Sequence, residues 1–99
     1  MPQPDKAIRQ RLDKWLWHAR VTKSRTLAQK LVGSGAVRVN GQRVTGSDHR
    51  VGAGDGLTIQ IHGRLRVLKI LGLAERRGSA GVAAALYDDI SPVLPKAES

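Results

Sequence analysis

The chain of 99 residues suffices for one small domain, and its lack of cysteine excludes disulfide bridges and the usual structural zinc sites. Seventeen Lys and Arg residues against eight Asp and Glu residues give a formal net charge of +9 and a sequence pI of about 11.2. No segment resembles a signal peptide or approaches the roughly 18 apolar residues of a membrane span, so we expect a soluble cytoplasmic protein with no membrane partner.

The excess positive charge lies in the first half of the chain. Residues 1–50 carry eleven Lys and Arg against three Asp and Glu, a net charge of +8, whereas residues 51–99 carry six against five. A basic region on a small domain is typical of nucleic-acid binding, because phosphates attract a cationic surface. Anionic membranes are a weaker alternative, since the basic helices are short and their apolar faces are needed for a core.

The first helix is predicted after a short N-terminal arm, residues 1–8, which we expect to be flexible. Apolar residues at spacing i, i+3, i+4 and i+7 predict one buried stripe: Leu12, Trp15, Leu16 and Ala19. A second, basic stripe is predicted beside the first: Arg11, Lys14 and His18.

The second helix is predicted to begin after Ser24, whose hydroxyl can accept a hydrogen bond from an otherwise unpaired backbone amide. Gly33 and Gly35 are suited to end it. Its predicted buried face consists of Leu27, Ala28, Leu31 and Val32, and its predicted exposed side includes Arg25 and Gln29.

A β-hairpin is predicted around Asn40-Gly41, the pair preferred by a two-residue type I′ turn. The strands are residues 37–39 and 42–44. This turn places Arg38 opposite Arg43, where like charges repel. An anion lying across the two arginines would relieve the repulsion, which indicates a polyanionic partner.

The rest of the chain predicts a loop, two strands and a last helix. Residues 45–56 are rich in glycine, although Val51 can pair briefly with a neighbouring strand. Strands at 57–61 and 65–71 are predicted to be joined by a three-residue turn that keeps Leu65 and Val67 on the face of Ile59 and Ile61. Ser79 is suited to cap a helix from residue 80 to about 89, followed by a flexible tail, residues 91–99.

This order of helices, glycines and hairpin resembles the S4 RNA-binding domain, also called the alpha-L motif. The matching positions are Arg11 to Asp13, Lys23 to Arg25, Ala28 to Val32, Gly35 and Val37 to Gly41. The block Arg11 to Trp17, the later Arg76-Arg77 and the alanine-rich segment ending in Leu86-Tyr87 are similar to the heat shock protein 15 family.

The resemblance implies an α+β, S4-type fold with two short N-terminal helices against a small antiparallel sheet, plus a C-terminal helix. The implied S4 domain is residues 9–61, with residues 62–90 packed on it as an extension. The implied partner is ribosomal RNA of the large (50S) subunit, particularly dissociated subunits that hold a nascent chain on tRNA.

We expect a non-catalytic contact surface for structured RNA. Its predicted members are Arg11, Lys14, Lys23, Ser24, Arg25, Gln29, Lys30, Arg38, Asn40, Gly41 and Arg43. Ser24 and the first amides of its helix could hold a phosphate, although capping alone explains this serine. Asn40 and Gly41 are needed for the turn in either case.

Other kinds of site have little support in the sequence. The three histidines, His18, His49 and His62, lack metal-ligand spacing, and Asp13 is expected to pair with a nearby cation or amide. We therefore expect no enzyme, cofactor, metal or small-molecule substrate. Trp15 is predicted to be in the core, and Trp17 to pack on the C-terminal segment. Nothing suggests an obligate dimer, so a monomer is expected.

Two alternatives remain open. The chain could be an RNA-binding accessory subunit of an RNA-modifying enzyme of the pseudouridine synthase type, because the same domain occurs as an appendage on such enzymes. It could also be a DNA-binding module, because the helix pair loosely resembles a helix-turn-helix. The Asn40-Gly41 hairpin argues against the DNA-binding alternative.

Overall fold

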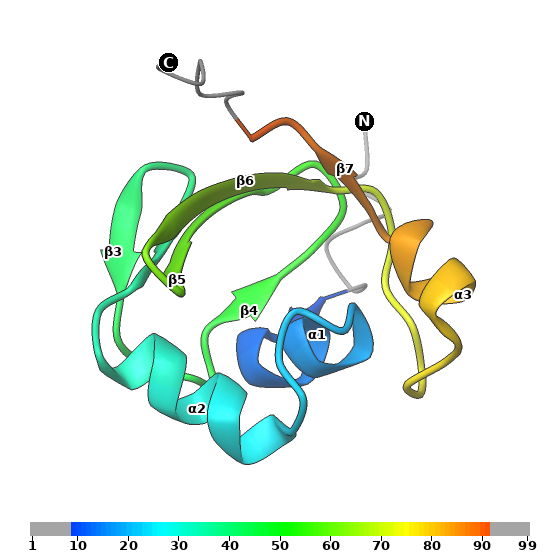
Figure 1. The fold of residues 1–99 in the computed structure, drawn as a ribbon, viewed down its shortest axis with the longest axis horizontal. Helices are drawn as coiled ribbons and strands as arrows, with labels where there is room; N and C mark the ends of the chain where they lie inside the picture. Colours follow the sequence, from blue (N-terminus) through cyan, green and yellow to red (C-terminus); the bar gives the residue numbers. More distant parts are fainter. Residues whose placement is uncertain (1–8, 92–99) are drawn as a thin grey trace.

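The computed structural model of the chain describes residues 9–91 and has an α+β fold in which two short helices pack against an antiparallel sheet (Figure 1). The helices are α1 (Leu12–His18), α2 (Arg25–Gly33) and α3 (Ala80–Ala84). The strands are β1 (Gln10–Arg11), β2 (Val37–Val39), β3 (Gln42–Val44), β4 (Arg50–Val51), β5 (Gly56–Ile61), β6 (Arg64–Ile70) and β7 (Tyr87–Asp89). The predicted fold class is confirmed; the predictions for residues 1–8 and 92–99 lie outside the described residues.

The main sheet has five strands in the order β3-β2-β5-β6-β7, and β1 pairs separately with β4. All pairs are antiparallel. The inner face of the sheet and the apolar faces of α1 and α2 enclose one core. Its fully buried strand residues are Val37, Val51, Leu57, Ile59, Leu68 and Ile70.

Helix α1 is the most enclosed helix, and its predicted apolar stripe is confirmed: Leu12, Trp15 and Leu16 are completely buried, and Ala19 is 2% exposed. The predicted basic stripe is wrong at His18, which is 1% exposed. Neighbouring segments cover α1 on both flanks, α2 on the side of Asp13 and residues 72–78 on the side of His18. The spacing of residues within one helix cannot predict that a distant segment covers its second flank.

The start of α1 is capped by backbone from a distant loop. Arg11 stands at the N-cap position and makes no side-chain cap. Instead, the amides of Leu12 and Asp13 donate to the carbonyls of His49 (2.7 Å) and Ser47 (3.1 Å). The same loop forms β4, in which Val51 pairs with Gln10, so the predicted brief pairing of Val51 is confirmed. The loop therefore supplies the acceptors that a helix start requires.

Helix α2 begins as predicted, because the Ser24 hydroxyl accepts a hydrogen bond from the Leu27 amide at 3.1 Å. Its predicted buried face is only partly correct. Ala28 and Val32 are completely buried, but Leu27 is 46% exposed and Leu31 is half-buried. Ala28 and Val32 belong to the buried core, Leu31 only packs against it, and Leu27 lies outside it.

The β2–β3 hairpin has the predicted register, with Arg38 opposite Arg43. Asn40 and Gly41 have φ values of 53° and 87°, as a type I′ turn requires. The Asn40 side chain also accepts a hydrogen bond from the Gly56 amide (2.9 Å) and donates one to Asp55 (3.2 Å). Asn40 therefore joins the hairpin to the start of β5.

The β5–β6 turn has two residues, His62 and Gly63, so the predicted three-residue turn is wrong. Both residues have positive φ, 53° and 72°, which again suits the twist of a two-residue hairpin. The register pairs Leu57 with Leu68 and places Leu68 in the core. A change of one residue in register reverses the faces of a strand, so Leu65 and Val67 lie on the face opposite the core.

The predicted helix over residues 80–89 is also wrong beyond its start. Ser79 caps α3 through the Val82 amide (3.3 Å), but the helix ends at Ala84. The chain then forms β7, which pairs with β6 and places the Tyr87 ring 6.2 Å from that of Trp15. Helix propensity is a weak preference, and here pairing with the β6 edge overrides it.

The connector, defined as residues 71–79, is held on β1 and α1 by hydrogen bonds between side chains and backbone carbonyls. Trp15 donates to the Gly72 carbonyl at 3.0 Å, and Gln10 donates to that of Ala74 at 2.7 Å. In the opposite direction, Arg77 donates to the Trp17 carbonyl at 3.1 Å, and its guanidinium lies 6.0 Å from the Trp17 ring. The predicted packing of Trp17 on the C-terminal segment is confirmed.

The double role of Asn40 can be measured. Replacing Asn40 with Gly keeps the positive φ and removes the two side-chain hydrogen bonds, so we expect a loss of about 1 kcal/mol in the free energy of unfolding. Replacing Asn40 with Ala adds the cost of the left-handed backbone, about 1 kcal/mol more. Urea denaturation of both variants separates the two contributions; equal stability of the two would contradict the assigned backbone role.

Candidate nucleic-acid interface

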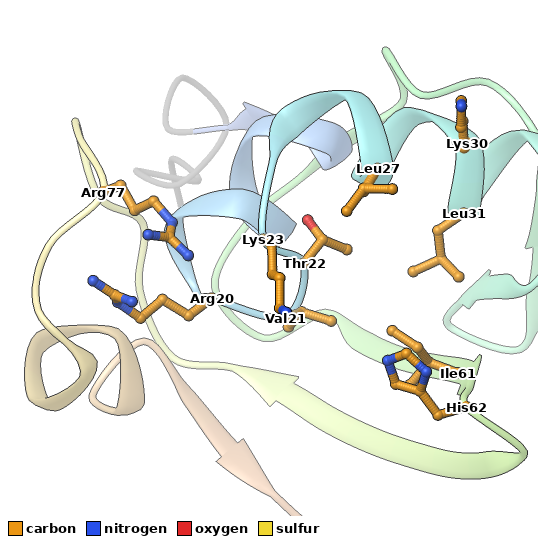
Figure 2. A pocket seen from close by; sticks show the side chains of 10 residues that line it. All are labelled: Arg20, Val21, Thr22, Lys23, Leu27, Lys30, Leu31, Ile61, His62 and Arg77. Atoms are coloured by element: carbon orange, nitrogen blue, oxygen red, sulfur yellow. The ribbon is translucent and has the colours of Figure 1, made fainter.

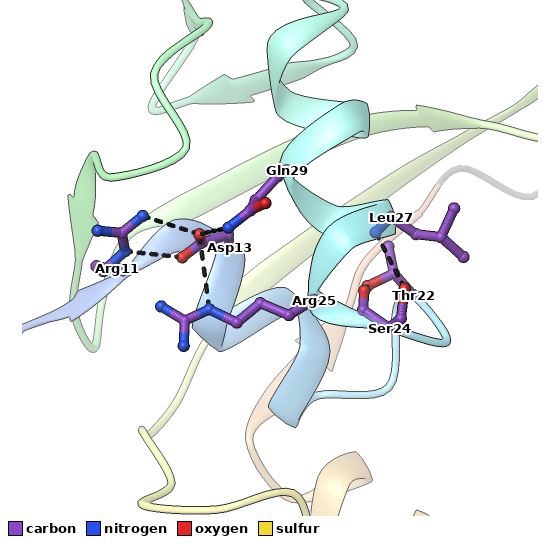
Figure 3. Close-up of polar contacts among 7 residues, drawn as sticks. All are labelled: Arg11, Asp13, Thr22, Ser24, Arg25, Leu27 and Gln29. Atoms are coloured by element: carbon purple, nitrogen blue, oxygen red, sulfur yellow. Dashed lines mark hydrogen bonds and ion pairs between the residues drawn. The ribbon is translucent and has the colours of Figure 1, made fainter.

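Asp13 is the centre of a polar cluster where α1 crosses α2 (Figure 3). Arg11 binds its carboxylate with two hydrogen bonds, from Nε to Oδ1 at 3.1 Å and from Nη2 to Oδ2 at 3.0 Å. The Gln29 side-chain amide donates to Oδ2 at 3.0 Å, and Nε of Arg25 lies 3.7 Å from the same atom. Three of the predicted RNA-contact residues therefore converge on one carboxylate.

The Asp13 carboxylate is completely buried, whereas the side chains of Arg11 and Arg25 are 38% and 40% exposed. Burial acts to raise the Asp13 pKa, but hydrogen bonds from Arg11 and Gln29 and the charges of Arg11 and Arg25 outweigh it, so this pKa lies below its ordinary value. The hydrogen bonds and charge of Asp13 in turn raise the pKa of Arg11. The cluster thus holds a buried anion beneath two partly exposed cations.

Arg25 is held in a way that leaves its outer atoms available. Its Nε is buried and has no hydrogen-bond partner among the described residues, since the Asp13 oxygen at 3.7 Å is beyond hydrogen-bond range. In Figure 3, the dashed line to the carboxylate begins at Nε, and neither Nη atom is joined to a partner among the residues drawn. A planar guanidinium with both Nη atoms available is suited to a bidentate contact with a phosphate.

The loop before α2 fixes where Arg25 begins its helix. Thr22, which is 7% exposed, donates its hydroxyl hydrogen to the Ser24 carbonyl at 2.9 Å, and Ser24 caps the helix (Figure 3). The Ser24 hydroxyl is therefore already used within the protein. Its predicted role in RNA contact stays a prediction, and its capping role is confirmed.

The remaining predicted residues lie in two other places. Lys23 and Lys30 are exposed and line a pocket on the other flank of α2. Arg38 alternates with the buried Val37 and Val39, so Arg38 and its neighbour Arg43 lie on the outer face of the sheet. Lys14 is half-buried on α1; Asn40 and Gly41 form the hairpin turn.

The pocket includes residues that the sequence prediction missed (Figure 2). It has a volume of about 740 Å³ and is lined by Arg20, Val21, Thr22, Lys23, Leu27, Lys30, Leu31, Ile61, His62 and Arg77. Arg77 is 57 residues from Arg20 in sequence, and only the folded connector brings the two together. In the sequence, only Leu27 could have indicated the pocket, because it is an apolar residue beside the exposed face of its helix.

The buried His18 ring is hydrogen-bonded to a backbone carbonyl of the connector. Its Nδ1 lies 2.9 Å from the Ala74 carbonyl, an acceptor only, so Nδ1 carries a proton and donates it. Burial lowers the His18 pKa, the hydrogen bond to Ala74 opposes this shift, and the charges of Lys14 and Arg25 reinforce it. His18 therefore belongs to the attachment of the connector and not to a cationic surface.

Two kinds of feature are absent from residues 9–91. None of the helices there is long and apolar enough to cross a membrane. In the same part of the chain, no three His, Asp or Glu side chains are grouped so that they could hold a metal ion.

Comparison with known proteins places this arrangement in a family. The S4 domain family matches residues 10–57. Heat shock protein 15 of Escherichia coli (strain K12) is 37% identical over 92 residues, which cover 93% of this chain and 68% of the relative. Its homolog from Aeromonas salmonicida is 38% identical over 97 residues, or 97% and 73% of the two chains. The chain belongs to the heat shock protein 15 family.

A solved structure supports the same assignment. The trimeric structure of Vibrio cholerae Heat Shock Protein 15 superposes with a TM-score of 0.75 and 38% sequence identity, covering 82% of this chain and 81% of that one. Membership of the heat shock protein 15 family and its S4 domain identify an RNA-binding protein.

The burial of Asp13 gives a first prediction for the interface. Asp13→Asn keeps the shape of the side chain but leaves Arg11 and Arg25 without their counter-charge. We expect a loss of about 1–3 kcal/mol in the free energy of unfolding. Because the folded pKa of Asp13 lies below its ordinary 3.8, its stabilisation is present above about pH 3.8 and is lost as the pH falls below it. Asp88→Asn on β7, which is exposed, is the control; equal losses in both variants would contradict the role of Asp13.

His18 gives a second prediction, at higher pH. Its folded pKa lies below the ordinary 6.5, so its contribution to stability is complete above about pH 6.5 and is lost as the pH falls through that value. His18→Asn keeps a donor for the Ala74 carbonyl and does not titrate. Thermal denaturation between pH 7.5 and 5.5 should show a smaller decrease in Tm for the variant than for the parent protein; parallel curves would refute the assignment.

Proposed function

We propose that this protein is a non-catalytic factor that binds structured ribosomal RNA of the large subunit and acts in ribosome recycling or quality control. The proposed targets are free 50S subunits that still hold a nascent chain on tRNA. Family membership supports the choice of RNA, and the sequence resemblance supports the choice of subunit.

The observation that carries the proposal is the Asp13 cluster. One buried carboxylate fixes Arg11 and Arg25 at the α1–α2 crossing, although these two arginines come from different segments of the chain. A prearranged pair of guanidinium groups loses less conformational freedom when it binds phosphates than two free side chains would. Such an arrangement suits the shape-based recognition of a folded RNA backbone.

The Arg38–Arg43 pair supplies a second phosphate contact in this proposal. Both side chains are exposed, and they stand opposite each other on the outer face of the hairpin. Among the described residues, no ion pair neutralises either of them. A phosphate between them would replace repulsion with attraction.

Salt dependence tests this surface. Replacing Arg25 or Arg38 with Ala should weaken binding to any structured RNA and reduce the slope of log affinity against log salt by about one each, since each change removes one phosphate contact. Filter binding or fluorescence anisotropy measures both quantities. Lys69→Ala, an exposed cation on β6 beside Asp88 of β7, is the control and should change neither. Unchanged slopes in the two arginine variants would refute the surface.

The cellular target is tested by sedimentation of the tagged protein in sucrose gradients of lysate, at low and moderate salt, with and without mild heat stress. We expect enrichment on free large subunits that is lost as salt rises. Equal occupancy on all translating ribosomes would indicate a structural ribosomal protein. Absence from ribosomes would refute the subunit assignment and direct attention to an RNA-modifying partner.

The oligomeric state is a separate question. A monomer stays our prediction, while the structure of the Vibrio cholerae relative is described as trimeric. Sedimentation equilibrium of the purified protein distinguishes the two.

A further inference from the structure

The pocket between α2 and the β5–β6 turn combines two kinds of surface (Figure 2). Leu27 and Leu31 of α2 form one wall, and Ile61 at the end of β5 lies across from them. Arg20 and Arg77 lie together at one end, away from Ile61 and His62. A volume of about 740 Å³ falls within the roughly 300–1,000 Å³ of typical ligand sites.

The charged part of the pocket is entirely cationic. Its four cations are Arg20, Lys23, Lys30 and Arg77, and no Asp or Glu of the described segment lines it. Among residues 9–91, none of these four side chains forms an ion pair. The positive charge of the pocket is therefore not neutralised by the described residues, and it would attract an anion.

The two arginines are fixed in place by the backbone. Nε of Arg20 donates to the Gly78 carbonyl at 2.9 Å, and Nε of Arg77 donates to the Trp17 carbonyl at 3.1 Å. Each arginine thus uses one donor for the protein and keeps its Nη groups for a ligand. Arg20 also has a φ of 61°, a backbone state that costs a residue with a side chain about 1–2 kcal/mol.

The apolar part of the pocket is partly exposed. Leu27 is 46% exposed, while Leu31 and Ile61 are half-buried. An apolar wall beside fixed cations suits a ligand with a flat, weakly polar part joined to an anion. A nucleotide has this composition, and extruded bases bind between apolar side chains.

We propose that this pocket receives one unpaired nucleotide of the bound RNA, with its base against Leu27, Leu31 and Ile61 and its phosphate at Arg20 and Arg77. The inference rests on the RNA binding described above and adds a base-holding subsite to it. Lys23 and Lys30 belong both to the predicted RNA-contact surface and to the pocket, so RNA on α2 would lie at its entrance. A second copy of this chain fits less well, because its net charge of +9 has the wrong sign.

The test compares two RNA hairpins that differ by one base. One carries a single bulged adenosine in its stem, and the other carries an abasic residue at the same bulge, so that the phosphate charge is identical. We expect the adenosine hairpin to bind about tenfold more tightly, because its base would cover the apolar side chains of the pocket and remove their surface from water. The Leu27→Ala variant should lose this difference and still bind the abasic hairpin as the parent protein does.

Leu65→Ala is the matched control, because Leu65 is 47% exposed and lies outside the pocket. It should keep the preference for the bulged adenosine. Equal affinity of the parent protein for the two hairpins, with salt-dependent binding to both, would overturn the subsite and leave RNA binding intact. Lack of binding to either hairpin would overturn both proposals. A change of oligomeric state in Leu27→Ala, with the base preference kept, would overturn the subsite in favour of contact between copies.

Discussion

The burial of one carboxylate determines how the first two helices meet. Asp13 is completely enclosed, and a buried charge is costly unless it is paired and hydrogen-bonded. Arg11 from the segment before α1, and Arg25 and Gln29 from α2, meet that requirement from different directions. Only a narrow range of crossing positions brings both α2 residues to the carboxylate that Arg11 already binds. The same constraint that orders the helices therefore also orders two cations at the surface, so stability and the proposed RNA contact share one set of residues.

Helix α1 has a second function, since it holds the connector as well as the core. The polar atoms of Trp15, His18 and Arg20 all bind carbonyls between Gly72 and Gly78. These bonds satisfy backbone groups in a segment that has no regular secondary structure, and they bring Arg77 to the end of α1. The block from Trp15 to Arg20 is thus explained by contacts some 56–60 residues away in the sequence.

Features set by neighbouring residues could be predicted from the sequence. The Ser24 cap, the Asn40-Gly41 turn with its Arg38–Arg43 register, and the apolar stripe from Leu12 to Ala19 all depend on local spacing. The predictions are wrong where contacts with segments distant in the sequence determine the local structure. His18 is buried by the connector, and residues 87–89 form a strand because β6 offers an edge. The three-residue turn was wrong for a different reason: alternating apolar residues in β6 fit either register, and the positive φ of His62 was not evident. The Asp13 cluster and the pocket could be predicted only in part, because Arg77 reaches the site through the fold.

The last strand changes how the sheet looks to a polyanion from a distance. Strand β6 carries Arg64, Arg66 and Lys69, but β7 places Asp89 3.2 Å from Arg66 and Asp88 opposite Lys69. At the far edge, no ion pair within residues 9–91 neutralises Arg38 or Arg43. The sheet is therefore electrically polar across its width, with a nearly balanced edge and a basic one. The field of a polyanion exerts a torque on such an asymmetric charge distribution and turns the hairpin edge toward the negative charge before contact. A larger share of diffusional encounters would then begin in the orientation that the proposed hairpin contact requires.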